Sequence, residues 1–497
     1  MADDSIEPLR RNALIMVWDG LRPDMVSEEL TPRLHALAGA GTWFERSHSV
    51  VPPVTRCNSA SLSTGTLPEH HGIPGNQFVM PLDDGVHLLN AADADHLEQL
   101  RPLRNGRLLH RRTLAELVSE VGGHTAIIGT GSPGAALLQH PQVRDRSSSG
   151  DAIYNHSLWL GSSRKDVEAE LGPMPEASVP NSEQNVYFTK LITDLLLTSS
   201  EAPALITFWH TDPDRTTHRH GVGHPDALGA LRDADRNLGT ILDALDATGR
   251  ADSTNVIVTS DHGFATVAER VNIDELLAFE GAKERADSSD VTTAGPAIFI
   301  TTPGISDEER RRATTAVVRV LQSEHTIGSI FTGARGRPPV FGTLPLSAVG
   351  QGGDLAPDVL FSFNWSDAPN EHGYEGVRPA GVAIKADHGS LSPWEMRNTL
   401  VATGPDFRRG YVSWLPAGII DVMPTLAHTM GIDPAFDVDG RVLHESLTES
   451  VTQVAGQTSP DPHSQLLERS AGAYRQRLQL SLYGGSTYVD FGEVERN

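Results

Sequence analysis

The chain has 497 residues, of which 38% are hydrophobic and 21% charged, so it can bury a sizeable core and is not a disordered, fibrous or low-complexity protein. Its 40 basic and 64 acidic residues give a formal charge of −24, which disfavours binding to nucleic-acid polymers and to anionic membranes. The single cysteine, Cys57, excludes an intrachain disulfide framework and a cysteine-based zinc cluster.

The first apolar run, Ala13–Trp18, is the candidate for a secretory signal in the N-terminal region. It is too short for the core of a signal peptide and is typical of a buried strand. The sequence contains no stretch of about 18 apolar residues, the length that a membrane-spanning helix needs. We therefore predict a cytoplasmic protein without a membrane partner.

Short apolar runs alternate with helical patterns along the chain. The runs expected as buried strands are Ala13–Trp18, Thr125–Gly129, Ala204–Trp209, Asn255–Thr259, Ala297–Ile300, Val359–Phe363, Val382–Ile384 and Thr399–Ala402. Helix signals lie between several of them: Thr31-Pro32, a capping box that begins at Thr113, and an apolar stripe over residues 228–245. This alternation predicts an α/β fold with a largely parallel central sheet and helices on both faces.

Two regions depart from the alternation, namely residues 131–195 and residues 265–356. We predict that both are cap-like insertions over the edge of the sheet. After about residue 450, a polar linker leads to a segment with a helix-like pattern, Gln465–Leu480. The predicted organisation is one large domain over residues 1–450 and a C-terminal extension over residues 451–497.

Carboxylate and imidazole side chains follow the predicted strands. They are Asp19, Asp214, His218, Asp261, His262 and His388. Because ligands bind at the carboxyl ends of strands in such sheets, we expect these side chains to converge. Each motif by itself also fits an ordinary turn or a helix-surface pair, but their combination in this order is informative. Oxygen and nitrogen ligands without thiolates suit zinc, manganese or iron.

Thr55 lies where an extended segment gives way to small residues that are compatible with a helix. A hydroxyl group at a helix N-terminus meets unpaired backbone N–H groups, which favour an anionic phosphoryl group. An ordinary helix cap by Thr55 or Asn58 is the alternative, and without the metal ligands it is the simpler interpretation.

Taken together, these motifs resemble the alkaline phosphatase superfamily and, within it, the nucleotide pyrophosphatase/phosphodiesterase branch. The resemblance runs from about residue 12 to residue 445. It is carried by Asp19-Gly20, Pro52 through Thr55 to Asn58, Thr64-Gly65, His71-Gly72-Ile73 with Asn76, Pro213-Asp214 to His218, Asp261-His262-Gly263, His388-Gly389 before Gly404-Pro405-Asp406-Phe407, and Asp421 to Leu426.

The resemblance implies two divalent cations, zinc ions with manganese or iron as alternatives. The implied ligands of one cation are Asp19, Asp261, His262 and Thr55. The implied ligands of the other are Asp214, His218 and His388. The resemblance further implies that Thr55 attacks phosphorus to form a covalent phosphothreonine, and that Asn58 contacts a phosphoryl oxygen.

Three features remain open at this point. His372 also precedes a glycine and competes with His388 as the last ligand, although the distance to Gly404 favours His388. His210 and His220 are expected to be neighbours of the site. Arg56 stands where nucleotide-cleaving members carry an aromatic residue, so it either pairs with a nearby acid or binds a second anionic group of the substrate.

The resemblance predicts an enzyme, a metal-dependent hydrolase of small-molecule phosphoric esters. Phosphodiester or nucleotide pyrophosphate bonds are the first candidates. A phosphomonoesterase or a phosphonate (C–P) hydrolase would need the same two-metal site. A phosphoryl transferase and a degenerate binding protein are the alternatives from other classes.

Overall fold

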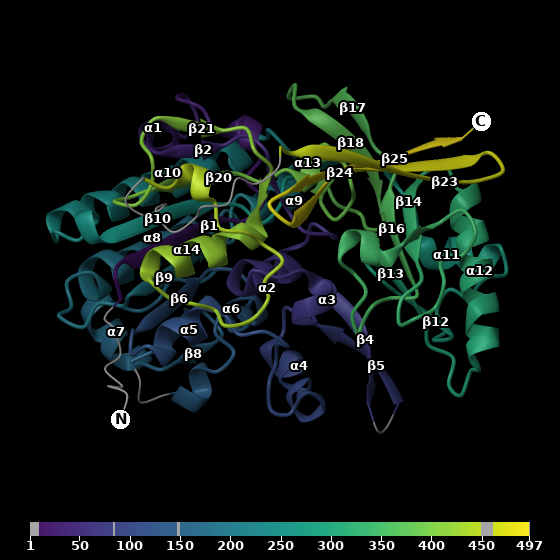
Figure 1. Ribbon diagram of the computed structural model, residues 1–497, viewed down its shortest axis with the longest axis horizontal. Coiled ribbons are helices and arrows are strands. Elements are labelled where there is room, and N and C mark those ends of the chain that lie inside the picture. Colours follow the sequence, from purple (N-terminus) through teal and green to yellow (C-terminus); the bar gives the residue numbers. More distant parts are fainter. Residues whose placement is uncertain (1–8, 83–84, 147–149, 449–460, 497) are drawn as a thin grey trace.

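The computed structural model describes residues 9–82, 85–146, 150–448 and 461–496, and its largest element is a nine-stranded sheet (Figure 1). The strand order is β21-β2-β20-β10-β1-β9-β6-β7-β8. These strands are β1 (Asn12–Trp18), β2 (Thr42–Phe44), β6 (Thr125–Gly129), β7 (Ala152–Asn155), β8 (Trp159–Leu160), β9 (Leu205–His210), β10 (Thr254–Thr259), β20 (Leu400–Thr403) and β21 (Tyr411–Ser413). All neighbours pair in parallel except those of β20 and the pair of β7 with β8. The predicted α/β fold with a largely parallel sheet is therefore confirmed.

Helices cover both faces of this sheet because its central strands are buried on both sides. Alternate side chains of β1 enter two separate cores, which explains the uninterrupted apolar run in its sequence. One core contains α2 (Thr55–Thr64), α5 (Leu114–Glu120), α6 (Pro133–Gln139) and α14 (Val422–Met430). The other contains α1 (Pro32–Ala40), α8 (Ser182–Lys190) and α10 (Pro225–Ala247). Among the described helices, none has the length and apolar character needed to cross a bilayer.

Local sequence signals set where several helices begin. Thr113 precedes α5, and its hydroxyl accepts a hydrogen bond from the Glu116 N–H at 3.2 Å while the Glu116 carboxylate accepts one from the Thr113 N–H at 2.8 Å. This is the predicted capping box. Helix α1 begins with Pro32 directly after Thr31, as the sequence predicted.

A second sheet lies beside the central one, to the right in Figure 1, and has its own core. Its strands are β12 (Val291–Ala294), β13 (Ala297–Ile300), β16 (Val359–Phe363), β14 (Ile327–Thr332) and β15 (Leu344–Pro345). Helices α11 (Ile273–Phe279) and α12 (Asp307–Ser323) pack against it. Two predicted strands, Ala297–Ile300 and Val359–Phe363, thus belong to a sheet other than the central one. The region 131–195, in contrast, contains β7 and β8 and extends the central sheet at its edge.

Two predicted elements are wrong. Val382–Ile384 is not a strand, and the Val382 side chain is 55% exposed. The chain instead forms the short strand β19 (Ala386–Asp387), which pairs with β11 (Ala265–Arg270) in a four-stranded sheet that also contains β17 (Ser366–Pro369) and β18 (Glu375–Ala380).

The segment Gln465–Leu480 is not a helix either. It lies in an antiparallel sheet of β23 (His463–Ala471), β24 (Tyr474–Tyr483) and β25 (Ser486–Arg496). Along β24 the buried residues alternate from Tyr474 to Leu480, which is the period of a strand. The buried Gln476 side chain hydrogen-bonds both backbone groups of Ile330, and this tertiary contact explains why a polar residue points inward.

The remaining elements are short. The helices are α3 (Pro68–His71), α4 (Ala94–Glu98), α7 (Arg164–Leu171), α9 (Asp214–His220) and α13 (Pro393–Met396). The strands are the pair β3 (Ser47–His48) and β22 (Ala417–Gly418) and the hairpin β4 (Gln77–Leu82) and β5 (Gly85–Asn90).

Candidate metal centre and active site

Three neighbouring central strands end at the same level and direct polar residues to one edge of the sheet. Val17 of β1 pairs with Thr259 of β10 on one side and with Trp209 of β9 on the other. The chain therefore leaves all three strands side by side, into the segments that begin at residues 19, 211 and 260. This register brings together side chains that are up to 243 residues apart in the sequence, since it joins Asp19 to His262.

Asp19, Asp261 and His262 form the first group of possible ligands, with one atom of each lying within 4.8 Å of the others. The His262 Nε2 atom lies 3.5 Å from Asp19 Oδ1 and 3.2 Å from Asp261 Oδ2. Among the described residues, these three buried atoms have no hydrogen-bond partner. Buried polar atoms without partners are costly, and a shared cation would satisfy all three.

Other contacts hold this first group in position. The second oxygen of Asp19 accepts a hydrogen bond from the Trp209 indole at 2.9 Å, and that of Asp261 accepts one from the Gly20 N–H at 3.1 Å. The His262 Nδ1–H donates to the Gly263 carbonyl oxygen at 3.0 Å, so Nε2 carries the lone pair in the neutral ring. Such outer contacts orient metal ligands in proteins.

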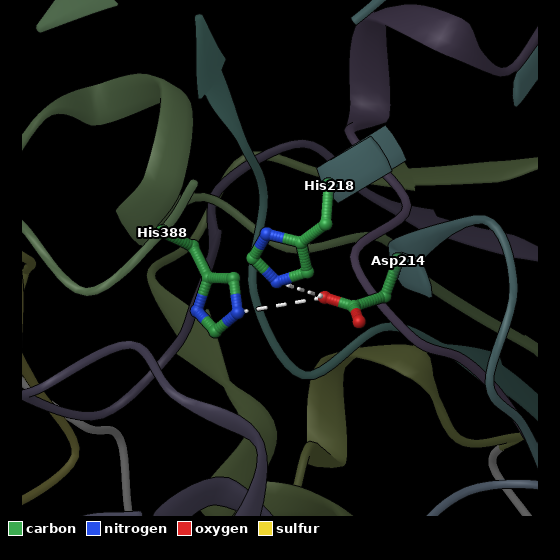
Figure 2. A group of neighbouring side chains, drawn as sticks. All are labelled: Asp214, His218 and His388. Atoms are coloured by element: carbon green, nitrogen blue, oxygen red, sulfur yellow. Dashed lines mark ion pairs between the residues drawn. The ribbon is translucent and has the colours of Figure 1, made fainter. Parts of the chain in front are cut away.

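Asp214, His218 and His388 form the second group, in which both rings point toward one carboxylate oxygen (Figure 2). The His218 Nε2 and His388 Nε2 atoms lie 3.3 Å and 3.4 Å from Asp214 Oδ1. Each ring donates its Nδ1–H to a backbone carbonyl, that of Ala386 at 2.9 Å and that of Pro53 at 2.8 Å. The two Nε2 atoms are thereby directed into the site, as in zinc sites with imidazole ligands.

The two groups belong to one site, because the rings of His262 and His388 stack with their centroids 3.5 Å apart. Burial and the nearby carboxylates Asp261 and Asp214 raise the pKa of Asp19 well above its usual value. Burial and Asp214 raise the pKa of Asp261 to about 6. Crowded buried carboxylates favour binding of cations, which offset their repulsion.

The second group behaves differently because it contains two imidazoles beside one carboxylate. Burial by itself would raise the pKa of Asp214, but the neighbouring His218 and His388 hold it well below its usual value. Burial opposes protonation of His218, yet Asp214 outweighs it and raises the pKa of His218 to about 9. A cation in this group would therefore have to displace a proton at neutral pH. The donor atoms of both groups fit divalent cations.

Thr55 is the first residue of α2 and lines a cavity of about 430 Å³ at this edge of the sheet. The cavity wall includes Arg56, Asn76, Asp214, His218 and His388. Val54 occupies the N-cap position, and no side chain caps the helix. The alternative in which Thr55 or Asn58 is an ordinary cap is therefore wrong.

Asn58 does not reach the cavity, which corrects the prediction that it contacts a phosphoryl oxygen. Its side chain is fully buried and accepts hydrogen bonds from the Ser49 hydroxyl and the Val50 N–H, both at 3.0 Å. Its Nδ2 donates to the Val54 carbonyl oxygen at 3.0 Å. Asn58 thus stabilises the segment that leads into α2 through these hydrogen bonds and does not face a ligand.

Asn76 is the cavity residue to which the sequence analysis gave no role. Its Oδ1 accepts a hydrogen bond from the Arg56 N–H at 3.0 Å, which leaves its Nδ2 group as a donor at the cavity wall. The residue is part of the His71-Gly72-Ile73 motif segment, so a sequence signal existed. Only the fold shows that this asparagine, and not Asn58, lies beside Thr55.

Arg56 makes no ion pair within the described part of the chain. Its Nε donates to the Ser132 hydroxyl at 3.2 Å. The other arginine of the cavity wall, Arg378, is neutralised by Asp387 and Glu395, each at 3.1 Å. Arg56 thus has no carboxylate within ion-pairing distance among the described residues, which contradicts a direct pair with a nearby acid, although its charge opposes the rise in the pKa of Asp19.

The remaining histidines lie outside both ligand groups. His372 lies next to His224, with ring centroids 6.0 Å apart, so the structure brings His388 and not His372 to Asp214. His210 is buried, and burial lowers its pKa to about 3, which keeps the ring neutral. His220 lies near His224 and Asp226 in a separate group.

Comparison with known proteins identifies a family and several relatives of this chain. The family described as Type I phosphodiesterase / nucleotide pyrophosphatase matches residues 13–331. Human ectonucleotide pyrophosphatase/phosphodiesterase family member 5 is 24% identical over 277 residues, which cover 55% of this chain and 49% of the human protein. Mouse Bis(5'-adenosyl)-triphosphatase enpp4 is 22% identical over 430 residues, which cover 85% of this chain and 78% of the mouse protein. The chain thus spans about half the length of the human relative.

Solved structures match over a larger share of the chain. Murine ectonucleotide pyrophosphatase/phosphodiesterase 5 aligns with a TM-score of 0.61 at 18% identity, covering 88% of this chain and 100% of the murine chain. An inactive threonine-to-alanine variant of the murine protein, in complex with AMP, aligns with a TM-score of 0.59 at 17% identity and the same coverage of 88% and 100%. At this level of identity the likeness shows a common fold.

Proposed function

This chain belongs to the type I phosphodiesterase / nucleotide pyrophosphatase family, and on that basis we propose that it is a hydrolase of small-molecule phosphoric esters. Phosphodiester and nucleotide pyrophosphate bonds are the first candidates. The observation that carries the proposal is the position of the Thr55 hydroxyl in one cavity with Asp214, His218 and His388. The AMP complex of the murine relative supports a nucleotide-type substrate.

Two divalent cations complete the proposed site, with zinc as the first choice and manganese or iron as alternatives. The proposed ligands of one are Asp19, Asp261, His262 and the Thr55 oxygen. The proposed ligands of the other are Asp214, His218 and His388. When bound, such a pair of cations neutralises phosphoryl oxygens and lowers the pKa of a bound hydroxyl group.

The residues of the chain account for the two chemical steps. The Thr55 oxygen attacks phosphorus and forms a new O–P bond, while the leaving-group oxygen departs with the electron pair of the bond that breaks. For a diester, the resulting phosphothreonine still carries the second ester group. Water then attacks its phosphorus, the bond to the Thr55 oxygen breaks and the Thr55 hydroxyl is restored, while the protons released in the two steps pass to the leaving groups and to solvent. Thr55 lies at the start of α2, where the positive end of the helix dipole favours an anionic phosphoryl group.

We expect Asn76→Ala to lower kcat by roughly a hundredfold, because it removes a hydrogen-bond donor to the phosphoryl oxygens that carry negative charge in the transition state. Asn58→Ala should instead lower the free energy of unfolding by about 2–3 kcal/mol, since buried partners lose their hydrogen bonds. Steady-state kinetics and urea unfolding of both variants measure the two effects. If Asn58→Ala were as stable as the wild type and lost more kcat than Asn76→Ala, Asn58 and not Asn76 would be the residue that contacts the phosphoryl group.

Arg56 is proposed to bind a second anionic group of the substrate. We expect Arg56→Gln, which keeps a hydrogen-bond donor but removes the charge, to lower kcat/KM by roughly tenfold or more on a substrate with an extra anionic group, as for a loss of about 1.4 kcal/mol. The loss on bis-p-nitrophenyl phosphate, which lacks such a group, should be clearly smaller. Arg56→Lys is the matched control that keeps the charge. Equal losses on both substrates would contradict this assignment.

The function itself is tested by an activity panel on the purified, zinc-loaded or manganese-loaded protein. The panel compares bis-p-nitrophenyl phosphate, nucleoside 5′-p-nitrophenyl esters, p-nitrophenyl phosphate and phosphonoacetate. We expect the highest kcat/KM on one of the two diester types, and loss of this activity with a chelator. A preference for p-nitrophenyl phosphate or phosphonoacetate would assign the chain to a monoesterase or C–P hydrolase instead, and activity on none would indicate a binding protein.

A cytoplasmic location stays a prediction, as does the lack of a nucleic-acid polymer or membrane as partner. The formal charge of −24 supports the latter, because it repels polyanions and anionic lipids. Fractionation of cells that express the protein from its own full-length gene tests the location, and recovery in a secreted or membrane fraction would contradict it.

A further inference from the structure

A third group of ligand-type side chains lies outside the proposed catalytic centre. His220 is the last residue of α9, His224 is the N-cap residue of α10, and Asp226 lies in the first turn of α10. One ligand atom of each lies within 4.8 Å of the others. The Nδ1 atoms of both histidines lie 3.6 Å from the same carboxylate oxygen, Asp226 Oδ2.

The backbone between these residues is held in one conformation. Gly221 and Gly223 have φ angles of 108° and 81°, which residues with a side chain rarely adopt. A Cβ atom on Gly223 would come within 2.4 Å of the Tyr374 ring. The Asn370 side chain donates a hydrogen bond to the Val222 carbonyl oxygen at 2.9 Å. The turn is therefore fixed against the loop between β17 and β18, which reduces the conformational entropy lost when its side chains bind an ion.

The group is also open to solvent, so an ion can enter and leave. The side chains of His220 and His224 are 28% and 34% exposed, and that of Asp226 is 53% exposed. The two imidazole rings stack with their centroids 5.0 Å apart, so they present their edges to the same carboxylate. His220 lies on the same helix as Asp214 and His218, but this group shares no residue with either buried ligand group.

From this arrangement we propose that His220, His224 and Asp226 form a peripheral site for a divalent transition-metal ion, with zinc as the best match. Two imidazoles and one carboxylate are the donor set that zinc prefers when thiolates are absent, and solvent completes the fourth position. Binding through His224 Nδ1 would cost one contact, because that atom accepts a hydrogen bond from the Asp226 N–H at 3.2 Å. The site is accordingly of modest affinity, and its ion is removed by dialysis.

The ion would join the end of α9 to the start of α10 across the glycine turn. Helix α9 also carries Asp214 and His218, so a bound ion stabilises the helix that supplies two of the proposed catalytic ligands. The peripheral site does not depend on the proposed hydrolase activity, since none of its three residues lines the catalytic cavity.

Zinc titration tests the proposal. Protein dialysed against zinc-free buffer is titrated with zinc chloride in a calorimeter, and the bound metal is counted by elemental analysis at saturation. We expect the wild-type chain to bind one more equivalent of zinc than the His224→Ala variant does. It should also bind one more equivalent than Asp226→Asn, a variant that preserves the size of the side chain. The same zinc addition should raise the Tm of the wild type by roughly 2–4 °C more than that of either variant.

His325→Ala is the matched control, because His325 is an exposed histidine that also lies beside a carboxylate, 2.8 Å from Glu324. It should bind as many equivalents as the wild type. Equal zinc uptake by the wild type, His224→Ala and Asp226→Asn would overturn the proposal. The three residues would then form only a group of ion pairs that binds no zinc. Failure of the hydrolase proposal would not alter this difference in uptake.

Discussion

Replacement of Thr55 by alanine is expected to lower kcat/KM for phosphodiester hydrolysis by on the order of a thousandfold or more, because the variant has no oxygen that can attack phosphorus. The fold should survive the change. Thr55 is not the N-cap residue of α2, and no side chain caps this helix. We therefore expect a Tm within about 2 °C of the wild-type value, since the change removes no cap.

Thr55→Ser is the matched control, because it keeps the hydroxyl group and loses only a methyl group. It should retain far more activity than Thr55→Ala. Mass spectrometry of wild-type protein quenched during turnover should detect the phosphoryl group with its remaining ester group on the peptide that contains residue 55, and the alanine variant should lack this adduct. Near wild-type turnover by a metal-loaded Thr55→Ala protein would rule out the covalent mechanism.

Replacement of His388 by alanine is expected to release one of the two cations that survive dialysis and to lower activity by at least about a hundredfold. The His388 Nε2 atom lies 3.4 Å from Asp214, and its ring stacks on His262, so this side chain belongs to the buried site. Loss of a single outer contact to a metal ligand already costs roughly 10–100-fold, and loss of the ligand itself should cost more.

His372→Ala is the matched control for this experiment. His372 was the competing candidate in the sequence, but its ring lies beside His224 and is 29% exposed. Elemental analysis after dialysis should find both tightly bound cations in this variant, with activity close to that of the wild type. The reverse result, with metal lost from His372→Ala and retained in His388→Ala, would refute the assignment of the second group.

Much of the fold was predictable from local patterns. The strands over residues 13–18, 125–129, 204–209 and 255–259 were recognised because central parallel strands are apolar on both faces. The residues that bear ligands were recognised for a related reason. Parallel strands end at one edge of a sheet, so a polar residue directly after each strand has few other places to lie. The positions of Asp19, Asp261 and His262 follow from that rule, whereas Asp214 and His218 lie on α9 and His388 follows β19 of another sheet. The roles of all six residues as ligands remain predictions.

The C-terminal region was not predictable in the same way. Residues 465–480 contain polar and charged side chains with scattered leucines, a composition that fits either a helix or an edge strand. The strand is favoured because Gln476 pairs with the backbone of Ile330 and because Leu478 and Leu480 enter the main core. These partners lie more than a hundred residues away in the sequence, so no local pattern contains them.

The sequence by itself thus determined the type of sheet, its central strands and which acidic and histidine residues gather at one edge. Tertiary structure alone decided which of two asparagines faces the cavity and whether Arg56 has an acidic partner, and it placed His388, which the sequence favoured over His372, beside Asp214. The physical reason is that the first set depends on periodicity and on strand ends, which neighbouring residues encode. The second set depends on contacts such as the hydrogen bond from Arg56 Nε to the Ser132 hydroxyl, which forms only after segments that are distant in the sequence have packed.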